Sequence, residues 1–81
     1  MSARAGQIME KMAKREPEIC SRILSAFDGM AEDPLAGKPL SGELKGMHSW
    51  RVGSYRIIYS IFRDVMRVLI VDVGHRREIY R

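Results

Sequence analysis

The chain has 81 residues, with 14 lysines and arginines, 10 aspartates and glutamates, and a net charge of +4 at pH 7. This length fits one domain, residues 1–81, in which one layer of helices packs on one sheet. The single cysteine excludes an intramolecular disulfide, and the longest apolar run, residues 68–71, is far shorter than the roughly 20 residues that cross a bilayer. The amino terminus turns polar before a signal region forms. The composition therefore predicts a soluble, cytoplasmic domain.

The excess positive charge lies in the carboxy-terminal half. Residues 1–41 hold six basic and six acidic residues, whereas residues 42–81 hold eight basic and four acidic residues. A positive field confined to one half of a chain indicates a polyanionic partner. A basic surface without a partner accounts for the same charges, so this alternative stays open.

Two amphipathic helices are predicted in the first half. Apolar residues recur at helical spacing in residues 3–14 and again in residues 17–32. Ser2 suits the cap of the first helix, and Pro17 suits the first turn of the second. Pro34 ends the second helix, because proline lacks the amide proton that a helix interior needs. The short connection predicts an antiparallel helix hairpin.

Three strands are predicted in the second half. Residues 49–52, 55–62 and 66–73 are rich in β-branched and aromatic residues, which fit a pleated and half-buried surface. Gly53 and Ser54 have the glycine-first order of a two-residue type II′ turn, and residues 63–65 make the second turn. The expected fold class is therefore α+β, with a two-helix antiparallel hairpin packed on a small antiparallel sheet.

Alternation along residues 55–62 predicts which side chains the helices leave uncovered. The odd-numbered residues are apolar or aromatic and should face the helices, so Arg56 stands on the opposite face. Arg51 lies across the predicted hairpin, and His75, Arg76 and Arg77 follow the last strand. We expect these five side chains to converge on one basic concavity, an expectation that fails if the register slips by one residue.

Three short segments, in this order, resemble a known family. They are Leu-Lys-Gly at 44–46, Gly-Ser-Tyr-Arg at 53–56 and Val-Gly-His-Arg at 73–76, with Tyr80 shortly after. Together with the helix hairpin they resemble the RelE/ParE superfamily of toxins from type II toxin–antitoxin systems, from about Ser2 to the end of the chain. The resemblance implies a RelE-like fold. For the RelE-like branch it also implies an mRNA interferase, which cleaves mRNA on the ribosome and thereby inhibits translation, and a cognate antitoxin as partner.

In the RelE-like branch the 2′-hydroxyl of the RNA attacks the adjacent phosphate, without a metal or a cofactor, and leaves a 2′,3′-cyclic phosphate and a 5′-hydroxyl. Guanidinium groups meet the negative charge that grows on the phosphate, while other groups move the protons. The resemblance assigns charge stabilisation to Arg56 and Arg76, with Arg51 as a looser match. It assigns proton transfer to His75 or Tyr80, the tyrosine alternatively stacking on the target base. It implies RNA binding by four more residues: Lys45, His48, Arg77 and Arg81.

The catalytic candidates also have structural interpretations. Arg56 is alternatively a strand residue paired with Asp72 or Glu78. His75 alternatively closes a turn, and Tyr80 alternatively packs on the sheet near a frayed terminus. These alternatives stay open at the level of sequence.

Two other residues are predicted to be structural. Trp50 is expected to anchor the contact between helices and sheet rather than to stack on a base. Cys20 borders the apolar stripe of the second helix and is expected to be a buried apolar residue. The two histidines and the cysteine lack the spacing of a metal site.

The sequence departs from the superfamily at its start. Relatives begin with a strand, whereas the residues after Met1 align with the first helix, so we expect the N-terminal strand to be absent. A sheet short of one strand exposes an edge, at which a second copy or an antitoxin segment would add a strand. This absence also puts the enzymatic activity in question. The alternative functions are a ParE-like toxin that binds DNA gyrase without enzymatic activity, and an inactive truncated paralogue that only binds antitoxin.

Overall fold

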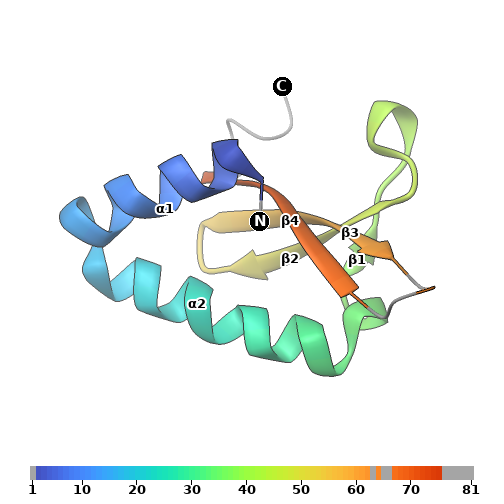
Figure 1. The fold of residues 1–81 in the computed structure, drawn as a ribbon, viewed down its shortest axis with the longest axis horizontal. Helices are drawn as coiled ribbons and strands as arrows, with labels where there is room; N and C mark the ends of the chain where they lie inside the picture. The colour runs from blue at the N-terminus through green and yellow to red at the C-terminus, as the bar shows by residue number, and fades with distance from the viewer. Residues whose placement is uncertain (1, 63, 65–66, 76–81) are drawn as a thin grey trace.

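The computed structural model describes residues 2–62, 64 and 67–75. Two helices, α1 (Ala3–Arg15) and α2 (Pro17–Glu32), precede four strands: β1 (Lys38–Pro39), β2 (Met47–Val52), β3 (Tyr55–Phe62) and β4 (Arg67–His75). Two 3-10 helices, Pro34–Ala36 and Gly42–Leu44, flank β1. The strands form one antiparallel sheet in the order β1-β2-β3-β4, with the helices beside it (Figure 1). The predicted α+β class is confirmed.

Local signals in the sequence account for both helices. The Ser2 hydroxyl accepts a hydrogen bond from the Ala5 amide at 3.1 Å and so caps α1, while Pro17 occupies the first turn of α2. Glu16 alone connects the two helices, which run in opposite directions (Figure 1). The predicted bounds of 3–14 and 17–32 agree with the structure to within one residue. No strand precedes α1 in the part of the chain that the structure describes.

The sheet contains one strand more than predicted. The β2–β3 hairpin has the expected two-residue turn, with Gly53 at a φ of 58°. The additional strand is β1, in which Lys38 pairs with Ser49 and Pro39 pairs with His48. Two residues, one of them a proline, carry no alternation pattern, so this edge strand was not predicted.

The hydrophobic core lies between the helices and one face of the sheet. Ile57 and Tyr59 of β3 are fully buried there, as the alternation predicted, and Cys20 is buried in the same core. The Tyr59 hydroxyl donates to the carbonyl of Pro34 at 2.7 Å, which ties the end of α2 to the sheet. In the described part of the chain, no helix is long and apolar enough to cross a membrane.

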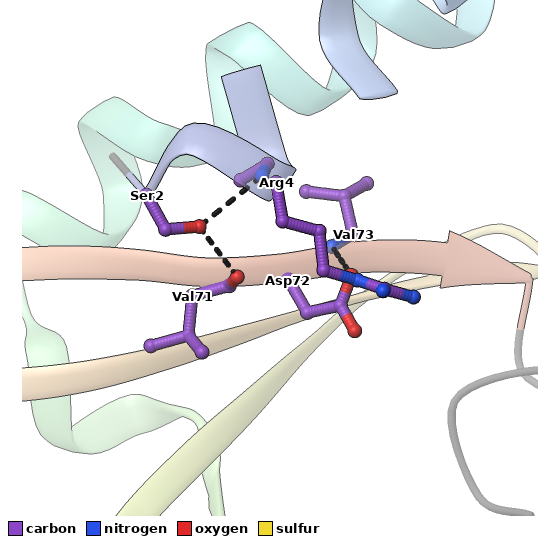
Figure 2. A network of polar contacts seen from close by, with 6 residues as sticks. Ser2, Arg4, Val71, Asp72 and Val73 are labelled. Atoms are coloured by element: carbon purple, nitrogen blue, oxygen red, sulfur yellow. Dashed lines mark hydrogen bonds and ion pairs between the residues drawn. The ribbon is translucent and has the colours of Figure 1, made fainter. Parts of the chain in front are cut away.

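A β-bulge interrupts β4. Ile58 of β3 pairs with Asp72 but the next residue, Tyr59, pairs with Ile70, so Val71 is the extra residue. Ser2 binds this bulge: its amide donates to the Ile70 carbonyl at 2.7 Å. Its hydroxyl donates to the Val71 carbonyl, also at 2.7 Å (Figure 2). The start of α1 is thereby fixed to the outer edge of β4.

Candidate nucleic-acid interface

Two arginines stand opposite each other on the face of the sheet turned away from the helices, which we call the distal face. Arg51 of β2 pairs in register with Arg56 of β3. Directly opposite residues in an antiparallel pair point to the same side, so both side chains belong to the distal face. Arg56 is half-buried, whereas Arg51 is exposed and its Nε donates to the Gly53 carbonyl at 3.1 Å. The predicted pairing of these two arginines is confirmed.

Arg56 lies where two open grooves meet. The first has a volume of about 360 Å³ and is lined by the segment Ala36–Lys38 and by Ser49, Trp50, Arg51 and Arg56. The second has a volume of about 280 Å³ and is lined by residues 38–41, Leu44 and Arg56. Lys38 and Arg56 line both grooves, so the two grooves share two cationic residues.

Sequence reasoning missed two residues of this site, Lys38 and Ser49. Lys38 belongs to the short strand β1, which has no sequence signal. Ser49 pairs with Lys38 on one side and with Ile58 on the other, so all three share the distal face. The alternation along β2 would have found Ser49, since it lies two residues from Arg51. Ser49 is 2 % exposed, and its hydroxyl makes no hydrogen bond within the described residues.

His75 does not join the arginines, so the prediction of one shared concavity is wrong for this residue. It pairs with Tyr55, on the helix-covered face, and its ring meets the Tyr55 ring edge-on with 5.8 Å between centroids. The bulge at Val71 is the physical reason. Without the extra residue, His75 would fall on the face of Arg56; with it, Gly74 faces Arg56 and His75 turns toward α1.

His75 lies instead at a separate groove of about 260 Å³ between α1 and the end of β4. Ile8, Met12 and Val73 give this groove an apolar lining, and Arg4 stands beside them. The Arg4 Nε donates to the Asp72 carboxylate at 3.1 Å, and the same oxygen accepts from the Val73 amide at 2.9 Å (Figure 2). Asp72, one of the two alternative partners predicted for Arg56, therefore has an ion pair with α1.

Two further predicted RNA-binding residues have different surroundings. Lys45 is exposed in the loop that leads into β2. His48 pairs with Tyr59 on the helix-covered face and stacks on its ring, with centroids 5.7 Å apart. His48 therefore does not share the distal face with the arginines, because successive residues of β2 point to opposite faces. Its contact with RNA stays a prediction.

Trp50 has the structural role that was predicted for it. Its ring packs on Gly29 of α2, where an added Cβ would lie 3.2 Å from the ring carbon Cζ2. Four predicted site residues, Arg76, Arg77, Tyr80 and Arg81, lie outside the described residues.

The distal face is chemically suited to a phosphodiester. Lys38, Arg51 and Arg56 supply ammonium and guanidinium donors, and a guanidinium forms two parallel hydrogen bonds to phosphate oxygens. Two guanidinium groups in register and a nearby lysine can together bind the phosphates of one strand.

Fold and site together define a small α+β protein with a cationic face on a helix-covered antiparallel sheet, and comparison with known proteins identifies its family. The model of the ParE toxin of the type II toxin–antitoxin system parDE matches residues 2–80. The chain belongs to the RelE/ParE superfamily of type II toxin–antitoxin toxins.

Relatives from Mycobacterium tuberculosis (strain ATCC 25618 / H37Rv) agree with this assignment. The chain is 41% identical to Toxin RelG over 70 residues, which cover 84% of this chain and 80% of RelG. It is 30% identical to Toxin RelE over 82 residues, which cover 100% of this chain and 82% of RelE. A solved structure, the toxin–antitoxin complex RelBE2 of M. tuberculosis, superposes with a TM-score of 0.81 at 35% identity, over 93% of this chain and 85% of that one.

Proposed function

We propose that the protein is a ribosome-dependent mRNA endonuclease that cleaves RNA by attack of the 2′-hydroxyl on the adjacent phosphate. The observation that carries the proposal is the position of Arg51 directly opposite Arg56, with Lys38 lining the same groove, on the distal face. Two toxins named RelG and RelE are similar over most of the chain, which supports the RelE-like branch.

The chemistry assigns distinct roles to these residues. The 2′-oxygen forms a bond to phosphorus while the bond from phosphorus to the 5′-oxygen breaks. The 2′-hydroxyl gives up its proton, and the leaving 5′-oxygen gains one. Negative charge grows on the phosphoryl oxygens in between. We assign its stabilisation to Arg56, since this half-buried residue is less screened by water than the exposed Arg51.

Arginine stays charged at neutral pH and does not serve as the proton carrier. Tyr80 therefore remains our proposed proton-transfer residue, and Arg76 a second charge-stabilising residue. His75 is not proposed to touch the scissile phosphate, because it faces α1 on the other side of the sheet.

We further propose that a cognate antitoxin neutralises the protein and that it acts in the cytoplasm, where mRNA is translated. The RelBE2 neighbour is a toxin–antitoxin complex, which supports an antitoxin partner. The outer edge of β4, the last strand of the sheet, is the proposed place for strand addition by an antitoxin segment or by a second copy, away from the carbonyls of residues 70 and 71 that Ser2 binds.

The test is induction of the protein in bacterial cells, followed by primer extension on a reporter mRNA. We expect cuts in phase with codons that disappear in Arg56→Ala and Arg76→Ala, and that persist in Lys11→Ala, a substitution of an exposed lysine on α1. Intact mRNA together with DNA damage and filamentation would instead support the ParE-like gyrase inhibitor. Intact mRNA without any growth arrest would support an inactive paralogue.

A further inference from the structure

The segment that connects α2 to β2 adds chemistry to the distal face beyond the two arginines. Lys38 lines both grooves with Arg56, and the second groove is also lined by Pro39, Leu40, Ser41 and Leu44. The two cations that the grooves share therefore lie beside two leucines and a hydroxyl of the same segment. Cationic and apolar side chains next to each other on one surface match a nucleotide, which has an anionic phosphate at one end and a flat base at the other.

A buried polar group supports a ligand at this place. Ser49 pairs directly with Lys38, lines the first groove, and is 2 % exposed. Within the described residues its hydroxyl has no hydrogen-bond partner. An unpaired buried hydroxyl costs stability, so its position beside a lysine and a half-buried arginine indicates a use in binding.

We infer that the segment Lys38–Leu44 and Ser49 form a nucleotide subsite next to the scissile phosphate, an inference that rests on the proposed function. Lys38 and the Ser49 hydroxyl bind the phosphate of a neighbouring nucleotide. Leu40 and Leu44 accept its base, and the Ser41 hydroxyl is available to its polar edge. The Lys38 contact strengthens binding of every sequence, whereas the Leu44 contact makes cleavage depend on which base enters.

The test uses purified protein and 70S ribosomes programmed with a defined mRNA, with the cleavage rate measured in a single turnover below saturation. We expect Lys38→Ala to lower the rate about tenfold or more at every codon, because a hydrogen bond to a charged group is lost. Leu44→Ala should change the relative rates at different codons by about tenfold. The matched control is Lys14→Ala, an exposed lysine of α1, which should cleave at the wild-type rate.

Ser49→Ala separates binding from folding. A hydroxyl that serves only the fold would lower the melting temperature when removed. A hydroxyl held for the ligand should instead raise the melting temperature by about 4–8 °C and lower the cleavage rate about threefold to tenfold.

Failure of the inference and failure of the proposed function give different results. If the wild-type protein cleaves mRNA on the ribosome and Lys38→Ala cleaves at the same rate with the same codon profile, the subsite is rejected and the endonuclease stands. Equal slowing in Lys38→Ala and Lys14→Ala likewise rejects the subsite, because the effect is then one of net charge. If the wild-type protein leaves the mRNA intact, both are rejected.

Discussion

Arg51 and Arg56 are direct partners in the β2–β3 hairpin, so two guanidinium groups occupy neighbouring positions on one face of the sheet. Two guanidinium groups side by side can together bind one anionic group, since each forms paired hydrogen bonds to phosphate oxygens. This arrangement supports the proposed binding of an RNA phosphate on the distal face.

The first prediction concerns anion binding at this pair. Inorganic phosphate should stabilise the wild-type protein more than chloride does at equal ionic strength, and this difference should shrink in Arg51→Gln, which removes one of the two guanidinium groups. Thermal unfolding in the two salts measures the difference, with Lys11→Gln as the control. An equal response of wild type and Arg51→Gln to phosphate would contradict an anion site at this pair.

The second prediction concerns His75. Because the bulge turns this residue toward α1, His75→Ala should retain cleavage within about threefold of the wild-type rate, whereas loss of a proton-transfer group typically costs about 10²–10⁴-fold. The rate on programmed ribosomes measures this, with Arg56→Ala as the inactive comparison. A hundredfold loss in a folded His75→Ala protein would place the histidine in the catalytic step.

The third prediction concerns Gly37, between the end of α2 and β1. An added Cβ would lie 2.8 Å from the Ser49 carbonyl and 3.0 Å from Cζ of Tyr59, and would meet the Tyr59 hydroxyl more closely still. Gly37→Ala should therefore destabilise the fold by about 1–3 kcal/mol. Gly6→Ala is the matched control, because a Cβ there meets nothing within 4 Å and an alanine favours helix α1 by about 0.5–1 kcal/mol. Urea unfolding of both variants should show shifts of opposite sign.

The fourth prediction concerns alkaline pH. Burial raises the pKa of the Tyr59 phenol; the charge of Asp33 also raises it, and a backbone hydrogen bond to Gly37 acts in the opposite direction. In the unfolded chain this phenol loses its proton near its ordinary pKa of about 10, before the folded protein does. The stability that depends on the protonated phenol is therefore present below about pH 10 and falls as the pH rises through the higher folded pKa.

Tyr59→Phe tests this titration. The variant should lose about 1 kcal/mol near neutrality, because the hydrogen bond to the Pro34 carbonyl is gone, but it should lose less additional stability than the wild type between about pH 8 and 10.5. Urea unfolding at the two pH values measures both differences. The same alkaline loss in wild type and variant would assign the titration to other groups.

The helices and the β2–β3 hairpin were predictable because each has a local signal. Ser2 caps α1, Pro17 begins α2, and Gly53 takes the positive φ that its turn needs. The pairing of Arg51 with Arg56 follows directly from that turn, since a two-residue loop fixes the register of the strands that it joins.

The rest depends on contacts between distant segments. The bulge at Val71 forms where Ser2 binds the carbonyls of residues 70 and 71. These residues are far apart in the sequence, so no local sequence pattern predicts the contact. The bulge places His75 on the helix-covered face instead of the distal face. The strand β1 likewise exists only through pairing with β2, and with it the position of Lys38 was missed.

The most direct test of the central claim is the single-turnover rate at which Arg56→Ala cleaves mRNA on programmed 70S ribosomes, compared with wild type and Lys11→Ala. If Arg56 stabilises charge on the phosphate as the 2′-oxygen attacks, the rate should fall about 10²–10³-fold while the melting temperature stays near that of the wild type. A folded Arg56→Ala protein that cleaves within about threefold of the wild-type rate would contradict the account, since the loss expected for a charge-stabilising donor is far larger.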